Sequence, residues 1–344
     1  PDLPFVGITG TNGKSSTAWY THQLLNQTGR RSYLGDNIGR PLSLLPLDID
    51  TGQDVDVAVV EVSSYQLERV GQFHPRVGVI LNLTPDHLAR HGTMADYGAA
   101  KLRLFENMDA HDVSILPADT TALPTERLSM GPAQPTILGI GTQPGLEIRD
   151  TELWLSGTSD DGPLSLSGFN LPGHHNRVNA GVAALIAVCL GARRAQLDLS
   201  GLQALEHRME SVHTQDGVTW INDSKATNVE STQAAIEGAP SPLILLVGGQ
   251  GKTGASYSQL RPGLAASATA VICFGASSDE IASALDGLPV HQVGGMREAI
   301  VLARRLARSG DCILLSPACA SFDEFLNFEE RGNVFTRLAR GAES

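Results

Sequence analysis

The sequence predicts an α/β protein of two domains, and three observations lead to this prediction. Its 344 residues, 42% of them hydrophobic, are enough to build two cores of ordinary size. Short β-branched runs alternate with amphipathic stretches over the first third of the chain, which is typical of a mainly parallel sheet covered by helices. The alternation begins again after about residue 207. We therefore predict one domain over residues 1–204 and a second over 205–344.

The first domain begins with strands and helices in alternation. Strands are predicted at Pro4–Thr9, Val55–Ser63, Arg76–Leu83 and Val113–Ala118, and helices from Ser15 to about Gln27 and from Met94 to about Glu106. Residues 119–172 are rich in Pro, Gly, Thr and Ser, which indicates a β-rich excursion that decorates the first sheet. A long apolar helix is expected over about 175–190, followed by another periodic stretch from Ala195 to Leu205.

The second domain repeats this organisation. A hairpin is predicted around Asp216 and Gly217, a helix from Thr227, and buried strands at LILLVGG, AVICFG and CILLSPA, with helices between them. Buried strands separated by helices are typical of the dinucleotide-fold, or Rossmann-like, class. The expected architecture is thus a mainly parallel first domain with a β-rich excursion, followed by a dinucleotide-fold domain.

The composition excludes several classes of protein. A net charge of −12 argues against a nucleic-acid partner, because phosphate binding over a surface needs a clustered basic face. The four cysteines show no CxxC pair, so we expect core residues in a reducing cytosol. No apolar run approaches the roughly 20 residues that span a bilayer, so no membrane segment is expected.

Only four of the 25 basic residues are lysine, namely Lys14, Lys101, Lys225 and Lys252. Each lies in a segment with the features of an active site. A compact ammonium group can react and bind in ways that the planar guanidinium of arginine cannot. The four lysines therefore indicate four candidate segments of a catalytic or binding site.

The segment GITGTNGKSS, residues 7–16, lies between a predicted buried strand and a predicted helix. Glycines there let backbone N–H groups face phosphate oxygens, and the helix N-terminus adds the positive end of its dipole. Lys14 would reach the terminal phosphates, and the Ser15 hydroxyl would ligate magnesium. A strict Walker pattern needs glycine where this chain has Ile8, so we predict a variant phosphate-binding loop.

Glu61 and His87 each follow a predicted strand, so both are expected at the carboxyl edge of the first sheet, where open α/β folds bind ligands. A carboxylate and a neutral imidazole can both ligate Mg²⁺ or Mn²⁺. Lys101, on the next helix, gains a role only beside a metal, where its amine could add CO₂ to give an anionic carbamate.

His87 and His91 are also four residues apart, as two zinc ligands on one helix would be. Leu88 stands where a zinc protease needs a glutamate, which argues against that class. We expect His91 to be a surface side chain.

Three polar or glycine-rich segments of the second domain follow predicted strands: residues 219–232, 247–254 and 316–325. The first, TWINDSKATNVEST, contains more polar groups than a helix cap needs, which favours a binding site. The glycines of the second, VGGQGKTG, would let backbone approach a ligand beside Lys252. The third, SPACASFDEF, is expected to open a helix that can bind a carboxylate.

These motifs together resemble the Mur ligase family. The resemblance extends from end to end of the chain and rests on GITGTNGKSS, GDNIGRP, EVSSYQLE, LNLTPDHL, GHHNRVNA, EHRME, NDSKATN, GGQGK and LLSPACASFDEFLNFEERG. It implies that residues 1–204 are a central P-loop ATPase domain and that residues 205–344 bind the amino-acid substrate. A first domain of the family binds a UDP moiety, and because this chain opens with Pro1 and a strand, we expect that domain to be missing from it.

The resemblance also implies roles for individual residues. Those expected to bind the ATP phosphates are Gly10, Thr11, Asn12, Gly13, Lys14, Ser15 and Ser16. Those expected at the rest of the nucleotide are Asn176, Asn179, Arg208, Asp223 and Lys225. Asn37 would contact the sugar-diphosphate part of the substrate, and the amino-acid pocket would consist of Thr227, Lys252, Ser321, Phe322 and Phe328. The expected catalytic residues are Lys14, Glu61, His87 and Lys101, with Ser15 and Glu61 on a first Mg²⁺ and His87 and carbamylated Lys101 on a second.

The reaction that the resemblance implies is ATP-dependent addition of D-glutamate to UDP-N-acetylmuramoyl-L-alanine through an acyl phosphate, in bacterial peptidoglycan synthesis. It would take place in the cytoplasm in a monomer, with small-molecule substrates and no nucleic acid or membrane. Two alternatives stay open. One is a related ligase with another amino acid, such as L-glutamate or the substrates of a folylpolyglutamate synthase. The other is a P-loop ATPase switch, against which the second domain and the Lys101 segment argue.

Overall fold

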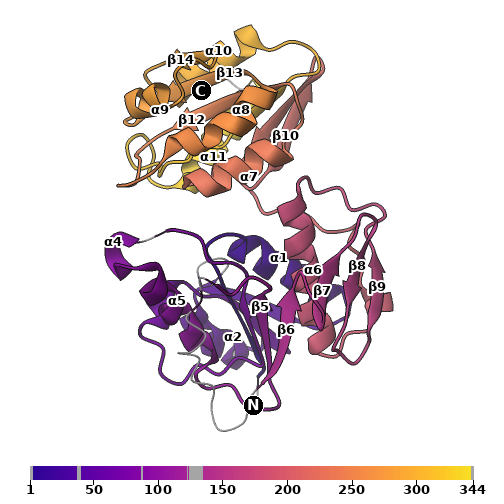
Figure 1. Cartoon of the computed structure of the whole chain (residues 1–344). Helices are drawn as coiled ribbons and strands as arrows, with labels where there is room; N and C mark the ends of the chain where they lie inside the picture. The colour runs from indigo at the N-terminus through magenta and orange to yellow at the C-terminus, as the bar shows by residue number, and fades with distance from the viewer. Residues whose placement is uncertain (1–2, 37–39, 87, 122, 124–134, 342–344) are drawn as a thin grey trace. The chain divides into compact units, whose positions relative to one another are not determined.

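The structure is a computed structural model in which residues 3–36, 40–86, 88–121, 123 and 135–341 are described. The chain divides into two compact units (Figure 1). The first comprises Pro1–Leu171 and His175–Gln203, and the second comprises Pro172–His174 and Ala204–Ser344. Within the described residues, no helix is long and apolar enough to cross a membrane.

The first unit is built on a mainly parallel sheet. Its strands are β1 (Phe5–Thr9), β2 (Ser32–Asp36), β3 (Val57–Glu61), β4 (Val77–Ile80), β5 (Val113–Pro117), β6 (Thr136–Ile140), β7 (Gly145–Ile148), β8 (Glu152–Leu155) and β9 (Gly162–Ser165). They lie in the order β2-β3-β1-β4-β5-β6-β7-β8-β9, and only the last two neighbouring pairs are antiparallel. The β-rich excursion thus continues the first sheet at one edge.

Helices cover the sheet of the first unit. They are α1 (Lys14–Gln27), α2 (Leu45–Asp50), α3 (Ser64–Leu67), α4 (Leu88–His91), α5 (Met94–Leu102) and α6 (His174–Cys189). Because side chains alternate along a strand, Val57 and Val59 of β3 pack in the cluster that contains α1 and α6. Ala58 and Val60 pack in the opposite cluster. Burial on both faces explains why this strand is a continuous apolar run.

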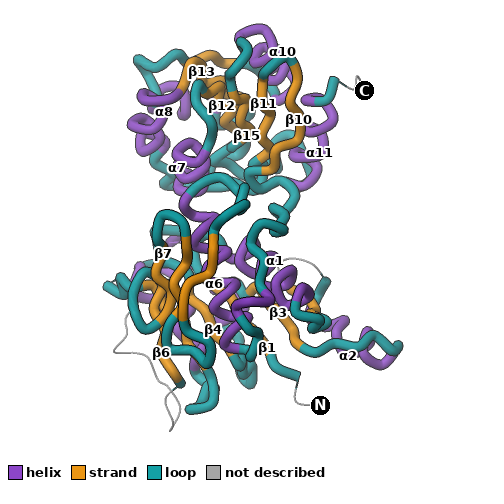
Figure 2. Tube along the Cα trace, turned by 90° about the vertical axis from the view of Figure 1, so that its right-hand side faces the viewer, coloured by secondary structure: helices purple, strands orange, loops and turns teal. Residues whose placement is uncertain are grey.

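The second unit has its own sheet, which is drawn with its helices in Figure 2. The strands are β10 (Glu210–Gln215), β11 (Val218–Asn222), β12 (Leu243–Gly248), β13 (Ala268–Phe274), β14 (Val290–Gln292) and β15 (Cys312–Leu315), in the order β10-β11-β15-β12-β13-β14. All pairs except the β10–β11 hairpin are parallel. The helices are α7 (Val229–Gly238), α8 (Arg261–Ser267), α9 (Ser278–Ala284), α10 (Met296–Leu306) and α11 (Phe328–Ala339).

The predicted fold class is confirmed, with two α/β units and mainly parallel sheets. Some elements differ from their predictions. Strand β2 was not predicted, and the periodic stretch from Ala195 to Leu205 contains only a short 3₁₀ turn at Arg194–Gln196. The segment SPACASFDEF does not open a helix, because α11 begins at Phe328, where the Asn327 side chain accepts a hydrogen bond from the Glu330 amide.

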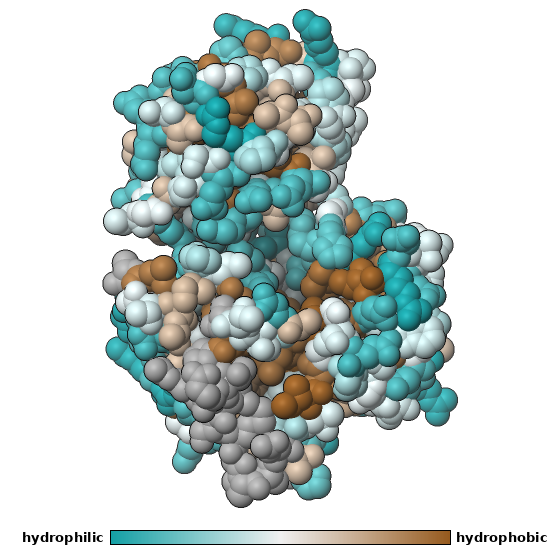
Figure 3. Space-filling model, viewed as in Figure 1, coloured by the Kyte–Doolittle hydropathy of each residue, from teal (hydrophilic) through white to brown (hydrophobic). Residues whose placement is uncertain are grey.

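The free cysteines and the distribution of residues on the surface are typical of a globular protein. Cys273, Cys312 and Cys319 are buried and Cys189 is partly buried, all four without a disulfide. On the face seen in Figure 3, hydrophilic residues cover much of the described surface, and the largest gathering of hydrophobic residues lies on the first unit. The core therefore depends on packing rather than on covalent cross-links.

Candidate active site

The loop between β1 and α1 has the backbone shape that its glycines predict. Gly10 has a φ of 152° and Gly13 has a φ of 84°, a conformation that residues with a Cβ rarely adopt. A Cβ on Gly13 would also come within 2.6 Å of Asn179 Oδ1. Glycine at position 13 is thus required both by the turn and by the close approach of α6.

Asn82, which follows β4, holds the loop in this shape. Its Oδ1 accepts hydrogen bonds from the backbone amides of Thr11 and Asn12, at 3.1 and 2.9 Å, and its Nδ2 donates to Asn12 O at 3.0 Å. The Thr11 hydroxyl adds a second link, because it donates to Thr84 O at 3.2 Å and accepts from Thr84 N at 3.0 Å. Sequence reasoning missed Asn82. Its place directly after a strand in LNLTPDH could have indicated a polar side chain at the carboxyl edge of the sheet.

Two lysines converge on one carbonyl of this loop. Lys14 Nζ donates to Gly10 O at 3.0 Å and to Thr11 O at 2.8 Å, while Lys101 Nζ donates to Gly10 O at 2.9 Å. Lys101 lies on α5 and only 1% of it is exposed. Burial, and then the neighbouring Lys14 charge, lower the pKa of the Lys101 amine well below its usual value. A lowered pKa means that more of this amine is neutral at a given pH than in an ordinary lysine.

Acidic and hydroxyl groups surround the same loop. Glu61 ends β3 opposite Ile8 of β1, and it is only 5% exposed. Among the described residues, Glu61 Oε2, Ser16 Oγ and Thr84 Oγ1 are buried oxygens without a hydrogen-bond partner. The carboxylates of Glu61 and of Asp86, a residue that sequence reasoning missed, both oppose the pKa decrease at Lys101. Buried oxygens without partners are unusual unless a ligand completes them. His87 and Asn37 lie outside the described residues.

The prediction that His91 is a surface side chain is wrong. Only 3% of its side chain is exposed. The imidazole stacks on Tyr65, with ring centroids 5.7 Å apart, and contacts the ring of Tyr97 at 5.1 Å. The sequence suggested an exposed residue because Arg90 and Gly92 flank it, whereas its partners come from α3 and α5.

The asparagines predicted to contact nucleotide lie on α6 against α1. Asn176 Oδ1 accepts a hydrogen bond from Tyr20 OH at 2.9 Å, and Asn179 Oδ1 accepts one from Thr17 Oγ1 at 3.3 Å. Both residues are nearly fully buried. Through the contact of Asn179 with Gly13, α6 lies directly beside the loop between β1 and α1.

In the second unit, three neighbouring strands end at one edge of the sheet. The loops after β11, β15 and β12 carry Asp223, Lys225, Thr227, Lys252, Ser321 and Phe322. Gln250 and Ala320 exchange backbone hydrogen bonds, each 2.9 Å long, and thereby join two of these loops. A Cβ on Gly249 would lie 2.4 Å from Ala320 O, so this glycine allows the two loops to approach each other. Phe322 is 68% exposed, unlike Ser321, which is buried.

Asp223 is a buried carboxyl at this edge. Ser316 Oγ donates a hydrogen bond to its Oδ2 at 2.8 Å, and Met209 N donates to its Oδ1 at 3.2 Å. Burial raises the pKa of Asp223 to about 7, although the positive charge of Arg208 acts in the opposite direction. Lys225, two residues later, has its Nζ 3.9 Å from the centre of the Phe328 ring.

Arg331, on α11, joins the loops that carry these residues. Its guanidinium donates to Ser224 Oγ and O, and to the carbonyls of Cys319 and Ala320, at 2.8 to 3.2 Å. Burial lowers the pKa of Arg331 to about 10. Sequence reasoning missed this residue, because its bonding partners lie far from it in the chain.

We expect Arg331→Met to lower the free energy of unfolding of the second unit by about 3 kcal/mol, because it leaves several buried carbonyls without donors. Arg337→Met is the matched control, since Arg337 lies on the exposed side of the same helix and its loss should change stability by less than about 0.5 kcal/mol. Urea unfolding of both variants would measure this, and equal midpoints would show that the Arg331 bonds contribute no net stability.

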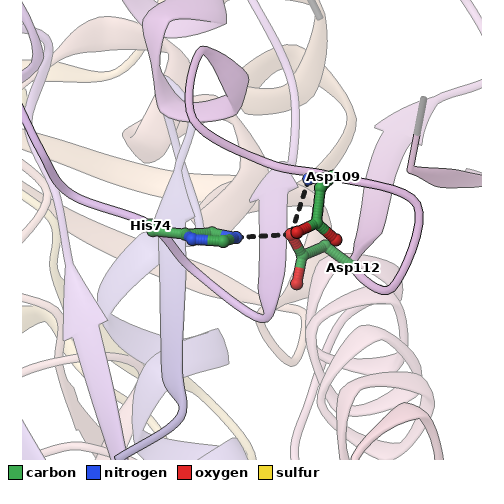
Figure 4. A group of neighbouring side chains, drawn as sticks. All are labelled: His74, Asp109 and Asp112. Atoms are coloured by element: carbon green, nitrogen blue, oxygen red, sulfur yellow. Dashed lines mark hydrogen bonds and ion pairs between the residues drawn. The ribbon is translucent and has the colours of Figure 1, made fainter. Parts of the chain in front are cut away.

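A separate group of possible metal ligands lies at the opposite, amino-terminal edge of the first sheet (Figure 4). It consists of His74, before β4, and of Asp109 and Asp112, before β5. Asp112 Oδ2 lies 2.6 Å from His74 Nε2 and accepts a hydrogen bond from Asp109 N at 2.7 Å. Arg76 donates to the other oxygen of Asp112 at 3.5 Å. Since these bonds already satisfy the buried carboxylate, we assign the group a structural role at the starts of two strands.

Comparison with known proteins gives matches over almost the whole chain. The Mur ligase middle domain matches residues 8–187, and the Mur ligase, glutamate ligase domain matches residues 207–319. UDP-N-acetylmuramoylalanine--D-glutamate ligase of Myxococcus xanthus is 41% identical over 98% of this chain and 75% of its own length. The protein of the same name from Anaeromyxobacter dehalogenans is 40% identical, with the same coverage of both chains. This chain thus spans about three quarters of these relatives.

Solved structures with lower sequence identity share the fold. MurF ligase from Thermotoga maritima in complex with ADP has a TM-score of 0.74 and 17% identity, over 99% of this chain and 81% of that one. Folylpolyglutamate synthase from Mycobacterium tuberculosis, complexed with ADP and AMPPCP, has a TM-score of 0.73 and 16% identity, over 97% of this chain and 91% of that one. At this identity the likeness concerns the fold alone.

Proposed function

This chain belongs to the Mur ligase family of ATP-dependent amide ligases, and we propose that it joins D-glutamate to UDP-N-acetylmuramoyl-L-alanine in the bacterial cytoplasm, as a step of peptidoglycan synthesis. Relatives about 40% identical over 98% of the chain are named for this reaction. The structural observation that carries the proposal is the buried, weakly basic Lys101 amine beside a glycine-rich loop. A simple nucleotide switch does not need such a group.

The chemistry sets the requirements for the site. A carboxylate resists attack by an amine because it is negatively charged and its leaving group would be oxide. Phosphorylation of the alanyl carboxylate by ATP gives an acyl phosphate and ADP. The glutamate amine then attacks the acyl carbon, the amide forms, and inorganic phosphate leaves. Such phosphoryl transfer depends mainly on the positions of the reactants and on neutralisation of charge.

The first unit supplies the phosphate site in this proposal. Residues 10–13 would bind phosphate oxygens, helped by the N-terminus of α1 and by Ser15 and Ser16. The amides of Thr11 and Asn12 would first have to give up their present hydrogen bonds to Asn82 Oδ1. Lys14 would exchange its present hydrogen bonds to Gly10 O and Thr11 O for bonds to phosphate. Asn176 and Asn179 would contribute from α6.

The residues around the loop fit magnesium. Glu61 offers a buried carboxylate oxygen without a partner, and hard oxygen ligands are those that Mg²⁺ prefers. In the proposal, Ser15 and Glu61 bind a first ion, and His87 and carbamylated Lys101 bind a second. Bound Mg²⁺ would neutralise the charge of the phosphates. Carbamylation adds CO₂ to the neutral Lys101 amine and releases one proton, and the lowered pKa of Lys101 favours this step.

The second unit supplies the amino-acid site in this proposal. Arg208, Asp223 and Lys225 would contact nucleotide. The glutamate would be bound by Thr227, Lys252, Ser321, Phe322 and Phe328, which lie on or next to the loops joined by Arg331 and by the Gln250–Ala320 bonds. Asn37, outside the described residues, is proposed to contact the UDP-linked substrate. A monomer is sufficient for all of these roles.

Phosphate release from ATP by the complete protein tests the proposal. We expect release that requires both UDP-N-acetylmuramoyl-L-alanine and D-glutamate, with L-glutamate inactive. Release with L-glutamate and a folate acceptor would identify the related ligase instead. Hydrolysis that is independent of any acceptor would identify a nucleotide switch, so each alternative has its own outcome.

A further inference from the structure

We propose that His91 is a positioning residue of the ligase site, which fixes the turn after Glu61 and helix α5 relative to the phosphate-binding loop. The proposal rests on the function proposed above. It arises from a side chain that the sequence indicates as a surface residue and that the structure buries against α3 and α5 of the first unit.

Both ring nitrogens of His91 have polar neighbours. Nε2 lies 3.0 Å from Ser64 Oγ, at the start of α3, and Nδ1 lies 3.2 Å from Glu68 Oε1. Burial lowers the pKa of the imidazole, which favours the neutral ring. We assign the proton of the neutral ring to Nδ1, where it faces the carboxylate of Glu68, so that Nε2 accepts a hydrogen bond from the Ser64 hydroxyl. This arrangement ties His91 to the segment that directly follows Glu61.

The ring of His91 also contacts two tyrosines. Tyr65 stacks on one side with an interplanar angle of 10°, and the Tyr97 ring lies at 37° with its centroid 5.1 Å away. Aromatic pairs at such distances contribute about 0.5–1.5 kcal/mol each beyond simple burial. The flat imidazole therefore fixes the position of Tyr97, which is itself only 1% exposed.

Tyr97 connects His91 to the phosphate-binding loop and to Lys101. Its hydroxyl lies 3.3 Å from Thr11 Oγ1 in the phosphate-binding loop. The Lys101 ammonium lies 4.5 Å from the centre of the Tyr97 ring. A displaced Tyr97 would thus disturb both the loop and the lysine. His91 itself contacts neither the loop nor Lys101 through these bonds, so it acts through Tyr97 and the turn that starts α3.

The chain offers a matched control in His22. Its Nδ1 lies 2.7 Å from Ser32 Oγ, its Nε2 lies 3.2 Å from Asn26 Nδ2, and its ring stacks on Trp19. Burial lowers its pKa as well. His22 therefore has the same kinds of partner as His91, but in the later part of α1, away from the phosphate-binding loop.

The experiment compares His91→Phe, His91→Gln, Ser64→Ala and His22→Phe in the complete protein. His91→Phe keeps an aromatic ring next to the tyrosines but loses both polar contacts, whereas His91→Gln keeps an amide that can reach Ser64. Binding of Mg²⁺ with the non-hydrolysable analogue AMPPCP is measured by calorimetry. KM is measured separately for ATP and for glutamate, and thermal unfolding confirms that each variant is folded.

We expect His91→Phe to weaken AMPPCP binding and to lower kcat/KM for ATP by about 10-fold to 100-fold, with KM for glutamate unchanged. Ser64→Ala should show a smaller loss of the same kind, and His91→Gln, which can reach Ser64 but has no ring to contact Tyr97, should recover only part of the binding. His22→Phe should lower thermal stability without changing nucleotide binding.

The proposal is overturned if folded His91→Phe binds AMPPCP as tightly as the wild type, or if His22→Phe loses as much binding as His91→Phe. Wild-type phosphate release that does not depend on glutamate would contradict the proposed function instead. The calorimetric comparison would still decide the role of His91, because it does not depend on the acceptor.

Discussion

Replacement of Lys101 by arginine is expected to lower kcat of the ligase by about 10³-fold or more. The reason is chemical, because a guanidinium remains protonated at any physiological pH and does not add CO₂ to form a carbamate. The Lys101 amine, by contrast, is almost fully buried and its pKa is well below the usual value. Arginine places a permanent positive charge at this position, so the loss would show that a positive charge there is not sufficient for activity.

Phosphate release with and without added bicarbonate measures this effect. Bicarbonate should not restore the Lys101→Arg variant, whereas the wild type should lose activity in CO₂-depleted buffer and regain it when bicarbonate is added. Arginine is larger than lysine, so Lys101→Met serves as a second variant that fits the buried site and should be equally inactive. Activity of Lys101→Arg within tenfold of the wild type would refute a carbamate at this position.

Glu61→Gln is expected to change activity and stability in opposite directions. The substitution keeps the shape of the side chain but removes the charge of a carboxylate that is 5% exposed and whose Oε2 has no partner among the described residues. Loss of the magnesium ligand that we propose at this position should lower kcat by about 10²–10³-fold. Removal of a buried charge should raise the free energy of unfolding of the nucleotide-free protein by about 1 kcal/mol.

Steady-state kinetics and urea unfolding of Glu61→Gln would test both halves of this prediction. Glu106→Gln is the control, because Glu106 is an exposed residue paired with Arg103, and neither activity nor stability should change appreciably. A Glu61→Gln protein that is less stable than the wild type would mean that the carboxylate has a structural partner. Unchanged kcat would remove Glu61 from the magnesium site.

The elements that are buried on both faces were the ones that the sequence pattern predicted best. β3 and β12 are continuous apolar runs, so their existence followed from composition alone. β2, with the sequence SYLGD, contains a glycine and two polar residues, and it forms because it pairs with β3 along its whole length. Pairing with a distant strand leaves no local signal, which is why β2 was missed.

The same contrast applies to the candidate site. Glycine-rich loops and strand-terminal polar residues have local signatures, so Lys14, Glu61 and the loop after β11 could be predicted as candidate site residues from the sequence. His91 and Arg331 could not, because their partners are distant in the chain, as in the bonds of Arg331 to Ser224. Burial changes the role of such residues, and burial is a property of the folded chain.

The transfer of ¹⁸O from substrate to phosphate tests the central claim most directly. If the complete protein receives UDP-N-acetylmuramoyl-L-alanine labelled with ¹⁸O in the alanyl carboxylate, together with ATP and D-glutamate, an acyl phosphate must pass one labelled oxygen to the released phosphate. We predict one ¹⁸O in the phosphate for each amide formed. Amide formation with unlabelled phosphate would contradict activation of the carboxylate by phosphorylation.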